Sequence, residues 1–191
     1  MSPRGGIVVL LEGASDVAAV RAAASSSGVD LADVHLVDMG GITNVRAHLR
    51  ALAAASHEPG TQDTPTVLGM CDAGEAHVVI SALAAGGGWT RDPSDLPSMG
   101  FFVCHRDLED ELLTALGARR TVDLLRRLGL GQKLEALRQQ PAWRDRALSD
   151  QLHRFAGVAS GRKELLAAAL TAELAPDELP EPLRLLLDRL R

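Results

Sequence analysis

Short apolar runs with the length of buried strands alternate, in the first half of the chain, with longer segments of helical period. The runs consist mainly of apolar residues, whereas the segments between them repeat apolar residues every three or four positions. The predicted strands are GIVVLLE (6–12), VHLVDM (34–39), TVLGMCD (66–72) and GFFVCH (100–105), and the predicted helices between them span 15–28, 43–56 and 75–88. Continuous apolar strands joined by helical crossovers form parallel sheets with helices on both faces. The pattern therefore predicts an α/β fold with a four-stranded, mainly parallel, Rossmann-like sheet and flanking helices.

Strand signals stop after residue 106, and the remainder of the chain has the pattern of helices. The predicted helices are 108–116, 119–128, 131–139, 144–156, 161–174 and 180–190. We therefore predict an α/β domain over 1–116, followed by a helical extension over 117–191 that packs on it. The last helix, in PEPLRLLLDRLR, is amphipathic, and we expect its apolar face to pack either on the same chain or on a partner such as a second copy. The segments 58–65 and 90–98 are predicted to be surface connections.

The composition indicates a globular chain with a hydrophobic core rather than a membrane-spanning or disulfide-rich protein. The chain has 191 residues, of which 46% are hydrophobic, so it can bury a sizeable core. It has no apolar stretch of membrane-spanning length and no signal-peptide pattern at its start, and we expect a cytoplasmic protein without membrane contact. Cys71 and Cys104 each lie at the end of an apolar run, which favours reduced, buried thiols over a disulfide or a zinc site.

Charge is unevenly distributed between the two halves of the chain. Residues 1–100 carry 5 Lys/Arg against 11 Asp/Glu, whereas residues 101–191 carry 15 against 14. The acidic half is where we expect a metal site. Tight binding to nucleic acid needs cations that replace the phosphate counterions, so such a partner would require arginines of the second half or a second protein. Trp89 and Trp143 lack the basic surroundings interleaved with further aromatic residues that form a stacking platform for single strands, and neither is expected to stack on bases.

Each predicted strand delivers a carboxylate to the edge of the sheet at which the strands end, the edge where open parallel sheets bind ligands. These carboxylates are Glu12, Asp38, Asp72, Asp107 and Glu109. Any one of them could be a helix cap or a first-turn charge that complements the helix dipole. Gathered together, they would repel one another unless a cation, a proton or hydrogen bonds compensated the charge. An oxygen-only ligand set favours Mg²⁺ or Mn²⁺ over zinc.

Residues next to the first two strands could complete such a site. Gly13 allows a tight turn or close approach of a phosphate, and Asp16 lies one turn later, where it can fold back beside Glu12. Gly40 and Gly41 open the second helix, where bare backbone amides could meet a phosphate; an ordinary turn is the alternative.

Four short motifs at the strand ends resemble those of a known family. LLEGASD, DMGG, GMCDAGE and CHRDLEDEL are similar, in order and spacing, to the Toprim motifs of OLD-family (overcoming lysogenization defect) ATP-dependent endonucleases, over roughly residues 6–115. The resemblance implies a Toprim fold and Mg²⁺-dependent phosphodiester chemistry, with Gly13 as the motif glycine. The positions that match the family's metal ligands are Glu12, Asp16, Asp72, Asp107 and Glu109.

One motif departs from the family pattern. Where the family has D-x-D, this chain has Asp72-Ala73-Gly74, followed by Glu75. Glu75 could replace the missing aspartate with its longer side chain, but a shift of one residue at a helix start turns the side chain by about 100°. A one-metal site and an inactive site are therefore open alternatives to a two-metal site.

The C-terminal part also resembles the family, in the stretch SGRKELLAAALTAEL. The resemblance would place Lys163 over the scissile phosphate, with Arg162 as a weaker candidate, while a solvent-facing lysine in a first helical turn is the alternative. The chain contains no G-x-x-x-x-G-K-[ST] motif, so the ATPase half of an OLD enzyme is expected to come, if needed, from a separate subunit.

These observations predict an OLD-like Toprim nuclease that nicks or cleaves DNA with Mg²⁺ or Mn²⁺, with RNA as an open alternative substrate. Glu12 would be a metal ligand and a general base, and Lys163 would stabilise charge on the phosphate in the transition state. The alternative is a degenerate domain that binds a nucleic-acid end or a partner protein without cutting. A different phosphoryl-transfer enzyme on the same scaffold is a third candidate. The nuclease prediction requires Glu12 and Asp72 to lie within about a dozen ångströms of each other.

Overall fold

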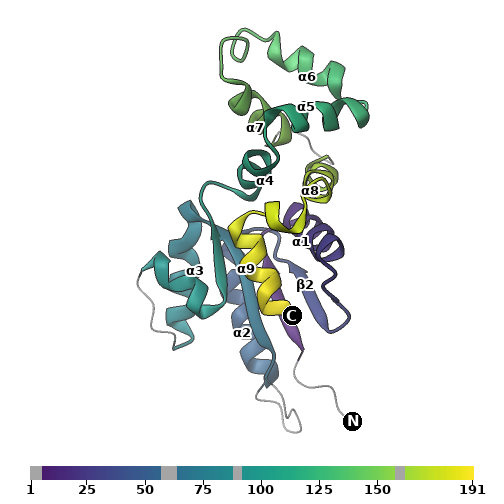
Figure 1. The fold of residues 1–191 in the computed structure, drawn as a ribbon. Coiled ribbons are helices and arrows are strands. Elements are labelled where there is room, and N and C mark those ends of the chain that lie inside the picture. Colours follow the sequence, from purple (N-terminus) through teal and green to yellow (C-terminus); the bar gives the residue numbers. More distant parts are fainter. Residues whose placement is uncertain (1–5, 57–63, 88–91, 158–161) are drawn as a thin grey trace.

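A four-stranded parallel sheet forms the centre of the protein in a computed structural model that describes residues 6–56, 64–87, 92–157 and 162–191 (Figure 1). The strand order is β2-β1-β3-β4, and every neighbouring pair is parallel. The strands are β1 (Ile7–Leu11), β2 (Val34–Asp38), β3 (Thr66–Asp72) and β4 (Phe101–Cys104). Each lies within one residue of its predicted bounds. The predicted parallel α/β fold is therefore confirmed.

Helices connect the strands and continue after the last one. The helices are α1 (Ala14–Ser27), α2 (Val45–Ser56), α3 (Ala76–Ala85), α4 (Leu108–Leu116), α5 (Ala118–Arg127), α6 (Gly131–Arg138), α7 (Leu148–Gly157), α8 (Lys163–Ala172) and α9 (Glu181–Leu190). Short 3-10 helices are η1 (Ile42–Asn44), η2 (Ala73–Glu75), η3 (Pro93–Met99) and η4 (Pro176–Glu178). None of the helices in the described ranges has both the length and the apolarity needed to span a bilayer.

The two faces of the sheet bury alternate strand residues, as the strand period of two requires. Val9 and Leu11 of β1 point into one core, which α1, α4, α8 and α9 cover, whereas Val8 and Leu10 point into a second core under α2 and α3. Val9, Leu10 and Leu11 are fully buried in these two cores. The sheet is thus held rigidly between helical layers, and its C-terminal edge is a fixed platform for side chains.

The amphipathic C-terminal helix packs on its own chain. Leu183 and Leu186 of α9 are fully buried in the core that also contains Phe102 of β4. Of the two alternatives from the sequence, packing on the same chain is therefore correct. A homodimer remains a prediction, but the apolar face on which it rested is occupied by the sheet.

Helices α5, α6 and α7 build a third core at the end of the molecule beyond α4 (Figure 1). Leu134 of α6 and Phe155 of α7 lie in its centre. Helices α8 and α9 return from this helical region to pack against α1 and the sheet. The predicted division of the chain into two domains after residue 116 stays a prediction.

Several sequence-based boundaries are wrong. The helix predicted over 144–156 begins only at Leu148, because the preceding residues form turns whose carbonyl groups are bound by the side chain of Gln151. The helix predicted over 75–88 begins at Ala76 and ends at Ala85, and the 3-10 helix η2 takes its first turn. In the segment 90–98, predicted as a surface connection, Leu96 of η3 is fully buried beneath α3. Most of the connection 58–65, together with Trp89, lies outside the described residues.

Candidate metal centre

Three carboxylates come together at the C-terminal edge of the sheet. Glu12 directly follows β1, Asp72 is the last residue of β3, and Glu75 ends the 3-10 helix η2. One oxygen of each lies within 4.8 Å of the others. Glu12 and Asp72 meet because β1 and β3 are paired in the sheet, so that both strands end side by side. The proximity that the nuclease prediction requires is thus present, and this acidic group could hold a metal ion.

Glu75 reaches the group because of the local backbone. A 3-10 helix rotates by a larger angle per residue than an α-helix, and Ala73–Glu75 forms such a turn before α3 begins. The turn brings Glu75 back toward Asp72 despite the one-residue shift relative to D-x-D. Its Oε2 is buried without a hydrogen-bond partner among the described residues. A buried carboxylate oxygen without a donor is costly, and a cation is one partner that would satisfy it.

A pocket of about 640 Å³ opens beside this group. Glu12 and Asp72 line it, whereas Glu75 lies in the acidic group but not in the pocket wall. The other predicted site residues that line the pocket are Gly13, Asp16, Asp38, Gly40, Gly41, Asp107, Glu109 and Lys163. The structure therefore brings all of the predicted site residues to one edge of the sheet, and their individual roles stay predictions.

The glycine turns at the pocket are already hydrogen bonded. The Gly13 amide donates to Asp16 Oδ2 at 3.0 Å, and the Gly40 amide donates to Asp38 Oδ1 at 2.8 Å. The Gly41 amide donates to the carbonyl of Glu12 at 2.8 Å, and both Gly40 and Gly41 have the positive φ values that favour glycine. The expectation of bare amides is therefore wrong. These glycines shape the turns, and phosphate binding by Gly13, Gly40 and Gly41 remains a prediction.

Asp107 combines a structural contact with one that the sequence did not reveal. Its Oδ1 caps α4 by accepting a hydrogen bond from the Asp110 amide at 2.7 Å, and its Oδ2 lies 2.7 Å from His153 Nε2 in α7. Both oxygens keep lone pairs for a further partner. His153 was missed because it lies 46 residues away in the chain and forms part of no motif. It ties the helical region to the edge of the sheet.

Lys163 provides a positive charge at the pocket. Lys163 is the first residue of α8, and its Nζ lies 3.3 Å from Glu109 Oε1. That distance defines an ion pair, although Glu109 Oε1 accepts no hydrogen bond from the described residues. Arg162 instead places its guanidinium 5.6 Å from the ring centre of Phe155 and does not line the pocket. The structure thus favours Lys163 over Arg162 as the cation of the site.

Burial and mutual repulsion raise the pKa values of the clustered acids. Burial raises the pKa of Glu12 to about 7, and the nearby carboxylates of Glu75 and Asp16 add to the increase. Burial likewise raises the pKa of Asp72 to about 7, with Glu12 as the next cause. For Asp16, burial raises the pKa to about 6, although its hydrogen bond from the Gly13 amide acts in the opposite direction. The protein thus keeps acidic groups together where they compete for protons near neutral pH, which is typical of functional sites.

The two cysteines lie just behind the acidic group and are not reactive groups. Both are free and buried, as the sequence predicted. Burial raises the pKa of the Cys71 thiol to about 12, with Asp72 as the second cause, and burial also raises the pKa of Cys104. Neutral, buried thiols of this kind are poor nucleophiles and poor metal ligands.

Comparison with known proteins identifies the fold. No protein-family model and no curated protein matches the chain. The solved C-terminal region of the OLD protein of Xanthomonas campestris pv. campestris is 24% identical, with a TM-score of 0.67 over 97% of this chain and 92% of that one. The corresponding region of the Burkholderia pseudomallei OLD protein is 16% identical, with a TM-score of 0.65 over 96% of this chain and 95% of that one. The chain therefore has the fold of the C-terminal region of OLD proteins.

The resemblance inferred from the motifs is confirmed at the level of the fold. The likeness to the OLD regions extends over nearly the whole chain, and so includes helices α5 to α9 as well as the part that carries the motifs. The strand-end acids of this chain thus occupy the edge of an OLD-like sheet.

Proposed function

We propose that this protein hydrolyses phosphodiester bonds in DNA with Mg²⁺ or Mn²⁺. The observation that carries the proposal is the meeting of Glu12, Asp72 and Glu75 within 4.8 Å at the edge of a parallel sheet. Ligand-binding sites of open parallel sheets lie at this edge. The fold shared with the C-terminal regions of OLD proteins supports the proposal.

The donors fit a hard divalent cation. All three side chains offer carboxylate oxygens. The acidic group, as far as the described residues show, contains no histidine or cysteine. Such a set suits Mg²⁺ or Mn²⁺ better than zinc. With pKa values raised to about 7, Glu12 and Asp72 are partly protonated near neutral pH, and these protons compensate part of the charge when no cation is bound. A bound cation would replace those protons, which gives a physical reason for the acids to be kept together.

In the proposed reaction, Glu12, Asp72 and Glu75 would hold the metal, and Asp16, Asp107 and Glu109 lie around the same pocket as candidate ligands for a second ion. The bound metal would supply Lewis-acid stabilisation of the phosphate and a more acidic water. Of the two roles predicted for Glu12, the geometry supports the ligand role, because its carboxylate lies within the acidic group.

Two further residues would act on the site without holding the metal: one positions a carboxylate, and the other provides a positive charge. His153 orients Asp107, as outer partners of metal-binding carboxylates commonly do. Lys163 carries a positive charge on the pocket wall, where it can stabilise negative charge that develops on the phosphate oxygens.

Nicking of supercoiled plasmid in Mg²⁺ or Mn²⁺, with EDTA as the metal-free control, tests the proposal. We expect relaxed and linear products only with metal. If metal binds and DNA is retained but not cut, the degenerate binding domain replaces the nuclease. Incubation of a single-stranded RNA under the same conditions decides between DNA and RNA as the substrate. Addition of an OLD-type ATPase subunit tests the need for that partner.

We expect Lys163→Met to reduce the nicking rate about a hundredfold, because one preorganised cation at the developing charge is lost. Lys163→Arg should recover part of the rate, since it keeps the charge with a different shape. The half-exposed side chain contributes little to folding, so the melting temperature should change little. Nicking by Lys163→Met at the wild-type rate would show that this lysine is only a surface charge.

A further inference from the structure

The acidic pocket by itself is a poor binding surface for a polyanion. Among the described residues that line it, every charged side chain other than Lys163 is a carboxylate. Affinity for a nucleic-acid backbone comes largely from cations that replace phosphate counterions. A substrate strand that reaches the acidic group must therefore be held by positive side chains outside this pocket.

A second groove, of about 520 Å³, lies on the helical region and contains such side chains. We call it the arginine groove; it is lined by Arg106, Trp143, Arg146, Asp150, His153 and Arg154. The three arginines are exposed. Within the described part of the chain, Arg146 and Arg154 form no ion pair, while Arg106 makes an exposed one with Asp110 at 3.5 Å. Together with one carboxylate, Asp150, the groove thus offers two arginines, Arg146 and Arg154, that form no ion pair with the described residues.

The arginine groove adjoins the acidic pocket. His153 lines the groove, and its Nε2 lies 2.7 Å from Oδ2 of Asp107, which lines the pocket. Arg106 of the groove directly precedes Asp107 in the chain. The two cavities therefore share the Asp107–His153 contact as their border. A strand that leaves the acidic pocket across this border enters the groove.

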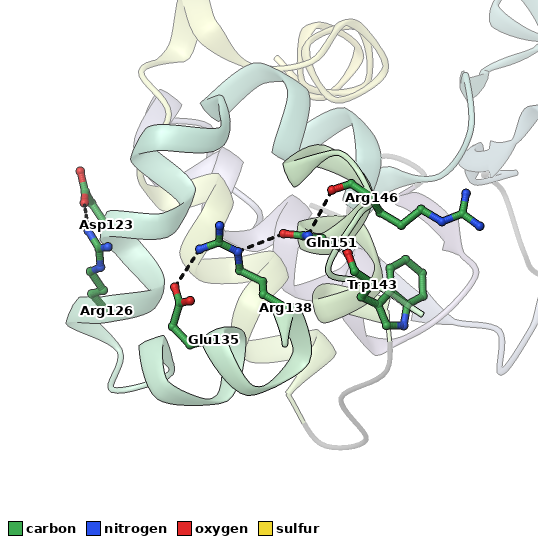
Figure 2. Close-up of polar contacts among 7 residues, drawn as sticks. All are labelled: Asp123, Arg126, Glu135, Arg138, Trp143, Arg146 and Gln151. Carbon is green, nitrogen blue, oxygen red and sulfur yellow. Dashed lines mark hydrogen bonds and ion pairs between the residues drawn. The ribbon is translucent and has the colours of Figure 1, made fainter. Parts of the chain in front are cut away.

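The segment that carries Trp143 and Arg146 is held in place by a buried glutamine (Figure 2). Gln151 donates from Nε2 to the carbonyls of Trp143, at 2.8 Å, and Arg146, at 3.1 Å. Its Oε1 accepts from Arg138 Nε at 3.0 Å. Figure 2 shows Trp143 and Arg146 on the side of Gln151 opposite to Arg138. A fixed backbone of this kind holds the half-buried Trp143 and the exposed Arg146 in place before a ligand arrives, which lowers the cost of binding.

Trp143 has a basic neighbour from the following helix in addition to Arg144 and Arg146, which are close to it in the sequence. The guanidinium carbon of Arg154 lies 5.7 Å from the centre of its ring, and Arg146 lines the same groove. The basic part of a stacking platform is therefore present at Trp143, because α7 brings Arg154 back to it. An aromatic ring beside arginines is the combination with which proteins bind single-stranded nucleic acid, since the ring stacks on a base and the arginines contact phosphates.

We propose that the arginine groove binds a single-stranded segment of the nucleic acid whose phosphodiester lies in the acidic pocket. Arg146 and Arg154 contact successive phosphates, and Trp143 stacks on an unpaired base. The inference rests on the proposed nuclease function, and it adds the strandedness of the substrate and its path across the Asp107–His153 border. Stacking on Trp143 requires a base that has left its own duplex stack, which is why a single strand fits better than a duplex.

Fluorescence anisotropy with a labelled oligothymidylate tests the groove, with EDTA present so that metal-dependent cleavage cannot consume the probe. The variant Arg146→Gln/Arg154→Gln should bind about 25-fold more weakly at about 0.1 M salt, because affinity scales with salt to a power of about −0.7 per phosphate contact. Its log–log salt slope should be smaller by about 1.4 for the same reason. Trp143→Leu should weaken binding about tenfold, while Trp143→Phe should stay within about threefold of wild type.

The matched control is Arg21→Gln/Arg50→Gln. It removes the same charge from exposed arginines of α1 and α2, outside the groove, and should bind like wild type. Melting temperatures confirm that each variant is folded. Equal weakening of the control and groove variants, or an unchanged salt slope, overturns the inference. Tighter binding of the corresponding duplex, with the same loss in the groove variants, contradicts the single-strand assignment.

Parallel plasmid nicking in Mn²⁺ separates this inference from the proposed function. Intact nicking with unchanged oligonucleotide binding by the groove variant rejects the groove alone. Absence of nicking by wild type, together with groove-dependent binding, rejects the nuclease and retains the groove.

Discussion

Asp72→Asn and Glu12→Gln are each expected to lower the rate of plasmid nicking in Mg²⁺ or Mn²⁺ by about a thousandfold or more. Each substitution keeps the shape of the side chain and removes the negative charge that a cation needs at the centre of the acidic group. The change acts on charge rather than packing, so both variants should fold. Rates are compared at saturating metal, where only the chemistry of the bound state differs.

A control of the same type lies at the opposite edge of the sheet. Asp33 is exposed beside the start of β2, so Asp33→Asn removes one carboxylate far from the ends of the strands. It should nick at the wild-type rate. Undiminished activity of Asp72→Asn and Glu12→Gln in the same purified preparations would place the chemistry elsewhere or in a contaminant.

The metal-free protein is expected to lose stability as the pH rises. The pKa values of Glu12 and Asp72 increase on folding from ordinary values of 4.5 and 3.8 to about 7, chiefly because of burial. Between about pH 4 and pH 7 these two carboxyls bind more protons in the folded chain than in the unfolded chain, so their contribution to stability is fully present below about pH 4 and is lost as the pH rises through about 7. With EDTA, the melting temperature should therefore fall between about pH 5 and pH 8.

Bound metal should reverse this dependence, because the cation binds the deprotonated acids. Saturating Mg²⁺ or Mn²⁺ should raise the melting temperature much more at about pH 8 than at about pH 5. Without metal, at the higher pH, Asp72→Asn should be more stable than wild type by roughly 1 kcal/mol after solvent screening, which raises the melting temperature by a few degrees. The melting temperature of this variant should also respond less to metal. Asp33→Asn should follow wild type. An apo melting temperature that rises with pH, or a metal effect independent of pH, would contradict this assignment of the acids.

The convergence of acidic residues at one edge of the sheet was predictable from a simple geometric rule. Parallel strands end at the same edge, so carboxylates that follow apolar runs, such as Glu12 and Asp72, must converge whatever the details of the helices. Strand bounds were correct within one residue because β1, β3 and β4 are buried and marked by mainly apolar runs, while the partly buried edge strand β2 still keeps three apolar residues of five.

What the sequence could not show depends on backbone detail and on contacts between distant residues. The position of Glu75 follows from a single 3-10 turn, which the α-helical period of the sequence does not indicate. The contact between Asp107 and His153 joins residues 46 apart, and no local pattern encodes it. The contact between Trp143 and Arg154 was hidden because Arg154 arrives from the next helix, after a turn that Gln151 fixes through the backbone.

Anomalous diffraction from crystals soaked in Mn²⁺ tests the central claim most directly. We predict a peak bound by carboxylate oxygens of Glu12, Asp72 and Glu75 at roughly 2.0–2.4 Å, with a second peak, if present, toward Asp107 and Glu109. A fully soaked crystal with no peak among these three residues, or with Glu75 turned away from a metal held by other groups, would contradict the account.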